Sequence, residues 1–97
     1  MRRLYLKSPA NLDYSEAIAW YKENQPGRAR EFETGLENLF GRIKEHPEHF
    51  PEIAPTVRKA LLRGFKYKIY FTVERDEIGV LAIYHPSRNP DALRKRF

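Results

Sequence analysis

YKIYFTVERDEIGVLAIY, residues 67 to 84, has the pattern of two β-strands joined by a short polar reversal. In its first half the apolar residues 67, 69, 71 and 73 alternate with Lys68 and Thr72, the period of two expected when one face of a strand is buried. Residues 78–84 are apolar on both faces, which is typical of a central strand. The stretch therefore predicts an antiparallel hairpin whose turn is residues 74–77.

Two other short segments complete the predicted sheet. Residues 57–62 (VRKALL) come just before the hairpin, and residues 4–6 (LYL) lie near the beginning of the sequence. The segment HPEHFPEIAP, residues 46–55, contains three prolines and is predicted to be an irregular linker, because proline lacks the N–H that a strand donates. We therefore expect four strands, mostly antiparallel.

Two amphipathic helices are predicted between the first strand and the linker. Ser8 is a candidate N-cap and Pro9 suits a first helical turn. The first apolar stripe consists of Ala10, Tyr14, Ala17, Ile18 and Tyr21, and the second, from about residue 28, consists of Ala29, Phe32, Leu36, Leu39, Phe40 and Ile43. The break at residues 25–27 (QPG) favours an antiparallel helical hairpin.

The fold class predicted from these patterns is α+β. A two-helix hairpin packs on a mostly antiparallel four-stranded sheet in the order βααβββ, and residues 1–97 form a single domain. The sequence contains no cysteine, which excludes a disulfide framework and a thiolate site. No apolar run reaches the roughly 20 residues needed to span a bilayer, so a cytoplasmic location without membrane contact is expected.

Charge is distributed unevenly along the chain. Residues 1–55 contain 8 Lys/Arg and 9 Asp/Glu, whereas residues 56–97 contain 10 Lys/Arg and 4 Asp/Glu. A basic C-terminal half favours a polyanion or an acidic protein as the partner. The alternative is a surface whose charge only keeps the protein soluble.

The basic residues suggest one possible chemistry, cleavage of RNA without a metal. That reaction needs a group to remove the proton of the 2′-hydroxyl, cations to stabilise the phosphorane, and an acid for the leaving oxygen. Cations are plentiful on or beside the predicted strands, namely Arg58, Lys59, Arg63, Lys66, Lys68 and Arg88. His85 is a candidate acid or base. The alternative is that the cations keep a sheet edge unpaired and that His85 binds a nearby carbonyl or carboxylate.

Other chemistries find little support. His46 and His49 flank Pro47, with Glu48 or Glu52 as a third ligand, but the spacing matches no known zinc pattern. The five glycines are scattered singly, so there is no phosphate-binding loop. Ser87 follows His85 by two residues, and this spacing alone makes no catalytic triad. No metal and no cofactor are predicted.

Four stretches give the chain a resemblance to the RelE/ParE family, the toxins of bacterial type II toxin–antitoxin pairs. They are SPAN…EAIAWY at 8–21, PGRAREF…L…I…P at 26–47, RKALLRGFKYKIYFTVERDEIGVLAIYH at 58–85 and SRNP at 87–90. Together they cover nearly all of the chain. The family fold, in the order βααβββ, is the same as the one that the periodicity predicts.

The resemblance implies one of two activities. RelE-like members cut messenger RNA in the ribosome with a set of Lys, Arg and Tyr residues, whereas ParE-like members poison DNA gyrase and lack much of that set. Lys59, Lys68 and Arg88 fall where RelE-like members carry functional cations, so these three, with His85, are the catalytic residues that a RelE-like activity implies. In that case the chain would be a metal-independent endoribonuclease.

The chain departs from the RelE-like pattern at three points. Leu61 stands in place of a second lysine, Lys68 replaces an arginine, and no tyrosine follows Arg88. An ammonium cannot bind phosphate through two parallel bonds as a guanidinium does. The ending H-x-x-R-x-P, residues 85–90, resembles the ParE-like branch and its plasmid-stabilisation relatives. A ParE-like, non-enzymatic inhibitor of gyrase is therefore the leading hypothesis, and a RelE-like ribonuclease is the alternative.

A third hypothesis is a degenerate toxin that only binds its antitoxin. In each case the resemblance implies an antitoxin partner with an acidic and apolar tail, and contact with operator DNA only through that antitoxin. The predicted residues for binding the target or the antitoxin are Arg58, Arg63, Arg88, Arg94 and Arg96. The basic end, residues 94–97, has two interpretations, a contact with a partner and a frayed terminus, and the sequence does not choose between them.

Overall fold

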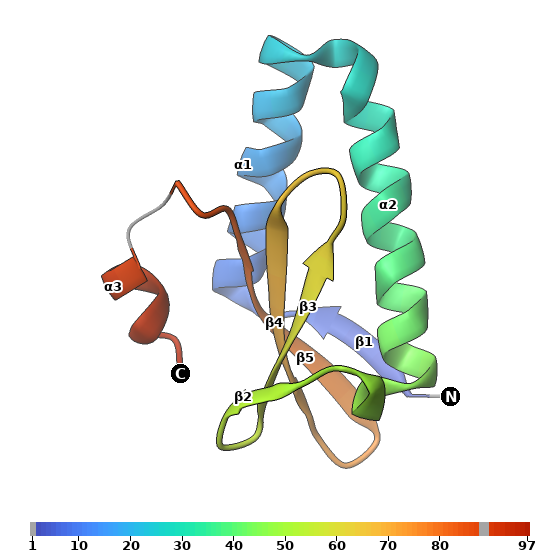
Figure 1. Ribbon diagram of the computed structural model, residues 1–97, viewed down its shortest axis with the longest axis vertical. Helices are drawn as coiled ribbons and strands as arrows, with labels where there is room; N and C mark the ends of the chain where they lie inside the picture. The colour runs from blue at the N-terminus through green and yellow to red at the C-terminus, as the bar shows by residue number, and fades with distance from the viewer. Residues whose placement is uncertain (1, 88–89) are drawn as a thin grey trace.

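Two long antiparallel helices lie against one face of a five-stranded sheet in the computed structural model, which describes residues 2–87 and 90–97 (Figure 1). The elements are β1 (Arg3–Leu6), α1 (Ser8–Asn24), α2 (Pro26–Glu45), the 3-10 turn η1 (Pro47–His49), β2 (Glu52–Ala54), β3 (Val57–Leu62), β4 (Tyr67–Val73), β5 (Glu77–Tyr84) and α3 (Pro90–Arg94). The helical hairpin is thereby confirmed, and each of its helices starts and ends close to the predicted position.

The helix boundaries follow from the local sequence, with one correction. Gln25 has φ −144° and ψ 66°, which ends α1, and Pro26 opens α2, where its missing N–H has no intrahelical acceptor. Pro9 lies in the first turn of α1 as predicted, but Ser8 is not the N-cap. The N-cap is Lys7, whose carbonyl accepts the N–H of Asn11 at 2.9 Å and whose side chain makes no capping bond.

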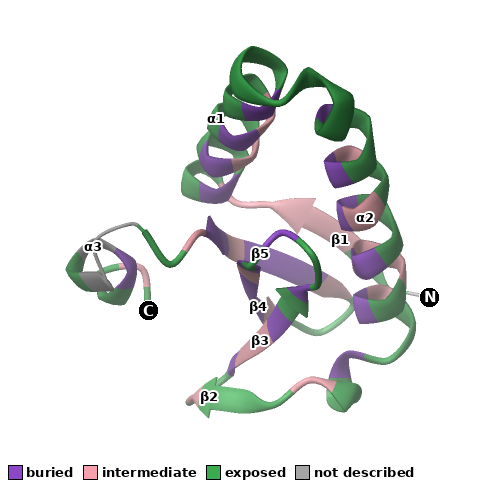
Figure 2. Cartoon of the chain, turned by 45° about the horizontal axis from the view of Figure 1, so that its top comes forward, coloured by how far each residue is buried: buried purple, intermediate pink, exposed green. Residues whose placement is uncertain are grey.

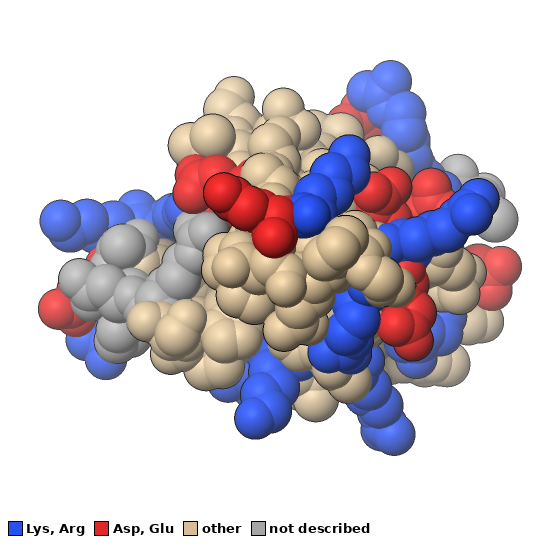
Figure 3. Space-filling model, turned by 90° about the horizontal axis from the view of Figure 1, so that it is seen from above, with Lys and Arg blue, Asp and Glu red and all other residues tan. Residues whose placement is uncertain are grey.

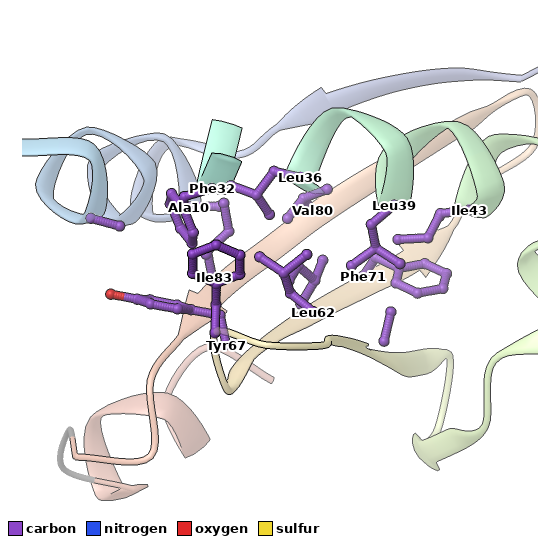
Figure 4. Packing of buried hydrophobic residues seen from close by; sticks show 14 of the residues in the cluster. Ala10, Phe32, Leu36, Leu39, Ile43, Leu62, Tyr67, Phe71, Val80 and Ile83 are labelled. Atoms are coloured by element: carbon purple, nitrogen blue, oxygen red, sulfur yellow. The ribbon is translucent and has the colours of Figure 1, made fainter. Parts of the chain in front are cut away.

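The predicted stripe of α2 forms one side of the core. Phe32, Leu36, Leu39 and Ile43 are fully buried, and they point from the helix toward the sheet residues Leu62, Phe71, Val80 and Ile83 (Figure 4). Such side chains contribute roughly 1.5–3 kcal/mol each through burial. The helices are therefore held on the sheet by this interface.

The sheet is mixed and has five strands, so the prediction of four strands was wrong in number. The strand order is β1-β5-β4-β3-β2, with antiparallel pairing at three junctions and parallel pairing between β1 and β5. The additional strand is β2, which lies in the segment predicted to be an irregular linker. It spans three residues at the sheet edge, where Pro51 and Pro55 flank the strand instead of interrupting it.

A second, smaller apolar cluster lies on the face of the sheet that the helices do not cover, here called the outer face. It contains Val57, Tyr70, Ala82, Tyr84 and, from α3, Leu93. The ring of Phe97 lies 5.3 Å from that of Tyr70. The C-terminal residues therefore fold back toward the sheet and do not form a frayed end (Figure 2).

Within residues 2–87 and 90–97, no helix combines the length and the apolar content that crossing a bilayer requires.

Candidate functional site

Lys59 and Lys68 lie on the outer face, on adjacent strands. Ala60 and Ile69 belong to the core beneath the helices, so the alternation of β3 and β4 directs both lysines to the other side. Lys59 pairs with Tyr70, two residues beyond Lys68, which makes the two lysines diagonal neighbours. The structure thus brings together two of the predicted catalytic cations.

Lys68 also lines a shallow depression at the end of the sheet. The depression has a volume of about 500 Å³, and we call it the basic depression; its side chains include Leu61, Arg63, Lys66, Lys68 and Pro86. Leu61, which stands where a second lysine was expected from the resemblance, is 50% exposed there. Three cations around an exposed leucine suit an acidic partner that also carries apolar side chains.

His85 lies in a different cleft, between α1 and the turn that joins β3 to β4. This cleft has a volume of about 490 Å³, and we call it the Trp20 cleft; its lining includes Trp20, Tyr21, Arg28, Lys66, Tyr67 and His85. The ring of His85 lies 5.0 Å from that of Tyr67, a residue of the core beneath the helices, and its Nδ1 is 2.8 Å from the hydroxyl oxygen of Ser87. His85 is therefore not grouped with Lys59 and Lys68 in one depression.

The turn joining β3 to β4 separates the two depressions, and its geometry is fixed by α2. Gly64 and Lys66 have φ of 86° and 61°, a left-handed conformation that glycine adopts freely and lysine rarely. Arg28 donates a hydrogen bond to the carbonyl of Gly64 at 3.0 Å and stacks over Phe65, 4.3 Å from the ring centre. Lys66 is thereby held where it lines both depressions.

The predicted arginines occupy separate places. Arg58 donates to the carbonyl of Phe50 at 2.6 Å, while Arg63 is exposed in the turn and Arg94 pairs with Asp91 at 3.5 Å. Arg88 lies outside the described residues. Arg58, Arg63 and Arg94 therefore lie in separate places, and the roles of all the predicted binding residues stay predictions.

Arg96, which is partly exposed, pairs with the buried carboxylate of Asp13. Its Nη2 donates to Oδ1 of Asp13 at 3.1 Å, its Nη1 donates to Oδ2 at 2.5 Å, and Oδ2 also accepts the N–H of Ile83 at 3.0 Å. The hydrogen bond to Asp13 raises the pKa of the Arg96 guanidinium above its ordinary value. This pair connects the C-terminal residues to α1 and β5.

A second polar cluster lies where β1 meets β5. The hydroxyl of Tyr5 donates to Glu74 at 2.7 Å, and Nζ of Lys7 lies 3.4 Å from the same carboxylate. These contacts, the Tyr5 hydroxyl first, hold the pKa of Glu74 below its usual value. The absence of a side chain at Gly79 makes room for them, since a Cβ there would come within 2.8 Å of Lys7.

Charge is mixed on the end of the molecule where the helical hairpin turns. Figure 3, which views this end, shows Lys and Arg interspersed with Asp and Glu instead of gathered by sign. A surface of this kind favours solubility over binding to a polyanion. The basic surplus of residues 56–97 therefore does not make every face of the protein basic.

Sequence reasoning did not identify Asp13 and Trp20. Asp13 falls three residues after Ala10 on the buried stripe of α1, and a carboxylate at such a position indicates a buried partner. Trp20 is 48% exposed on the same helix, and an exposed tryptophan beside the apolar stripe was the available signal for the cleft.

Comparison with known proteins identifies relatives along almost the whole chain. A family model described as "ParE toxin of type II toxin-antitoxin system, parDE" matches residues 4–90. The ParE2 toxins of two strains of Mycobacterium tuberculosis, CDC 1551 / Oshkosh and H37Rv, are each 27% identical over 93 residues, which cover 95% of this chain and 89% of theirs. A solved structure, "Chromosomal ParDE TA system from P. aeruginosa", has a chain that matches with a TM-score of 0.75 and 20% identity, over 88% of this chain and 96% of that one.

Proposed function

Because this chain belongs to the ParE toxin family of type II toxin–antitoxin systems, we propose that it arrests growth by binding DNA gyrase and that a cognate antitoxin neutralises it. The action is non-enzymatic and takes place in the cytoplasm. Operator DNA is contacted only through the antitoxin. Residues 1–97 form one toxin domain in this proposal.

The placement of His85 supports binding over ribonuclease chemistry. General acid–base catalysis needs the acid or base within hydrogen-bond reach of the reacting atoms. His85 packs on Tyr67 in the Trp20 cleft, whereas Lys59 and Lys68 lie on the outer face. The exposed apolar side chain of Leu61 beside those lysines also suits a protein contact better than a phosphate contact.

Message mapping after induction of the chain without its antitoxin tests this proposal. We expect growth arrest and DNA damage signals with intact messenger RNA, as poisoning of gyrase requires. New cleavage inside reading frames, seen by primer extension, would contradict it. An absence of any growth effect would instead favour the degenerate toxin.

The RelE-like alternative is favoured by one observation, the shared face of Lys59 and Lys68. A Lys59→Ala/Lys68→Ala variant tests it, with Lys22→Ala, an exposed change on α1, as the control. A ribonuclease would lose message cleavage in the double variant and keep it in the control. For a gyrase poison neither protein cleaves messages.

We propose that the antitoxin contacts the basic depression, with exposed Leu61 as an apolar anchor and Arg63, Lys66 and Lys68 as charges that steer an acidic segment. Binding of the protein encoded beside the toxin gene is the measurement. We expect Leu61→Asp and Lys68→Glu to weaken it by at least about tenfold, a loss that hot-spot changes of more than 1.4 kcal/mol produce. The exposed change Lys22→Glu is the matched control, and equal weakening by that change would refute the assignment of this surface.

A further inference from the structure

The 3-10 turn η1 places two imidazoles and a carboxylate together on the surface. His46 precedes the turn and His49 ends it, and residues three apart lie one above the other in a 3-10 helix because it has three residues per turn. The two rings accordingly stack, with centroids 4.6 Å apart and planes 11° apart. Nδ1 of His46 also lies 3.4 Å from Oε1 of Glu48.

The backbone that carries these side chains is held at both ends. The N–H of His46 donates to the carbonyl of Arg42 in α2 at 2.9 Å, and the N–H of His49 donates to the carbonyl of His46 at 3.0 Å. Pro47 between them is buried. At the other end, the carbonyl of Phe50 accepts a bond from Arg58 in β3 at 2.6 Å. A ligand set on such a backbone needs only side-chain rotation to close on an ion.

We propose that His46, Glu48 and His49 bind one divalent first-row transition metal ion, of which Zn²⁺, Ni²⁺ and Cu²⁺ are the best suited. The ligand atoms of the three residues lie within 4.8 Å of one another. Two imidazoles with one carboxylate form a His₂Glu set, which zinc takes with a further position open to water. All three side chains are exposed, so they can turn to meet an ion from solvent.

The nature of the donors determines selectivity. Mg²⁺ and Ca²⁺ prefer oxygen ligands, and this set offers two nitrogens with one carboxylate. Glu52, another carboxylate of the same segment, lies 4.0 Å from Arg58 and is not part of the group. The proposed metal site rests on the geometry of η1 alone. A test of metal binding is therefore independent of whether the chain binds gyrase.

Calorimetric titration of the untagged chain with ZnCl₂ tests the site. We expect one Zn²⁺ per chain and no binding of Mg²⁺ at the same concentration. His46→Asn and His49→Asn should each weaken Zn²⁺ binding by at least about tenfold. Even a change of a residue that only orients a ligand often reduces metal affinity by about 10–100-fold. Glu48→Gln weakens it in the same direction.

Two matched controls keep the test specific. His85→Asn removes a histidine in the Trp20 cleft, and Glu52→Gln removes the neighbouring carboxylate, and both leave the Zn²⁺ affinity unchanged. A chain that binds no Zn²⁺, a His46→Asn/His49→Asn variant that binds as well as the original, or a control that binds as poorly as the ligand variants would each overturn the proposal.

A measurement on the unmutated chain does not depend on the folding of variants. Paramagnetic Cu²⁺, added below one equivalent, should broaden the NMR signals of residues 46–49 before those of His85. Broadening that begins at His85 or spreads evenly over the chain would also overturn the proposal.

Discussion

The guanidinium of Arg96 donates two hydrogen bonds to the carboxylate of Asp13, 83 residues earlier in the chain. The Asp13 side chain is 3% exposed and that of Arg96 is 26% exposed. A carboxylate so deeply buried costs several kcal/mol in desolvation unless its charge is paired. The C-terminal residues thus supply the guanidinium that pairs with the buried carboxylate of α1.

Replacing Arg96 by methionine should lower the free energy of unfolding by about 2–3 kcal/mol, because Asp13 would keep its buried charge without the guanidinium. Urea denaturation measures this loss. Arg94→Met is the matched control; Arg94 is 78% exposed and pairs with Asp91, so a change within about 0.5 kcal/mol is expected. In an Asp13→Asn/Arg96→Met double variant the two losses should not add, and full additivity would contradict the pairing.

The hydroxyl of Tyr84 provides a second test. It is buried and has no hydrogen-bond partner in the part of the chain that the structure describes. A buried hydroxyl without a partner is destabilising, so Tyr84→Phe should raise the free energy of unfolding by up to about 1 kcal/mol. Tyr84→Ala, which also removes the ring, should lower it by about 3 kcal/mol. A clear loss of stability in Tyr84→Phe would show that the hydroxyl has a partner.

The contact of Tyr5 with Glu74 predicts a dependence of stability on pH. The pKa of Glu74 lies below its ordinary value of 4.5 in the folded chain, mainly because the carboxylate accepts the Tyr5 hydroxyl. A lowered carboxyl pKa stabilises the folded state at pH values above the unfolded pKa, and this contribution disappears as the pH falls through the folded pKa. The melting temperature of Glu74→Gln should therefore lie below that of the original chain at pH 7, and the gap should close in acid.

Tyr5→Phe is the control for this cause. Without the hydroxyl, the gap between the glutamate and glutamine forms should be smaller at pH 7, because the largest contribution to the shift has been removed. Melting curves of the original chain, Glu74→Gln, Tyr5→Phe and the double variant, recorded from pH 7 to pH 3, measure both gaps. A gap that stays constant over this range would exclude titration of Glu74 as its origin.

Arg88 lies outside the described residues, and its role in target contact stays a prediction. Arg88→Ala should relieve growth arrest while the melting temperature stays within about 4 °C, the shift that a change of 0.5 kcal/mol gives in a domain of this size. Arg30→Ala, an exposed arginine on α2, should remain toxic. Loss of toxicity together with unfolding would assign Arg88 to the fold instead of the target.

Local patterns predicted α2 and the strands from β3 to β5 because apolar spacing depends on neighbouring residues only. The prediction failed at β2, where pairing with β3 at the edge needs few hydrogen bonds and tolerates flanking prolines. Leu93 and Phe97 pack near Tyr70 on the outer face. The basic sequence of residues 94–97 could not predict this packing, because it depends on contacts between distant parts of the sequence.

Part of the candidate site could likewise be predicted from the sequence, and part of it could not. The shared face of Lys59 and Lys68 follows from strand alternation once β3 and β4 are neighbours. The separation of His85 from these lysines depends on how the chain leaves β5, and the Trp20 cleft depends on the approach of α1 to the turn after β3. Neither relation is encoded in a short pattern.

Among the strands of the described sheet, β1 is synthesised earliest, and it cannot pair until β5 has been synthesised. β1 pairs with β5 through residues such as Arg3 and Glu77, which are 74 positions apart in the sequence. Asp13 and Arg96 are separated further, by 83 positions. Contacts of such long range form late and slowly. A growing chain therefore cannot complete this sheet before residues 77–84 have left the exit tunnel, and the pair of Asp13 with Arg96 forms only after Arg96 has emerged.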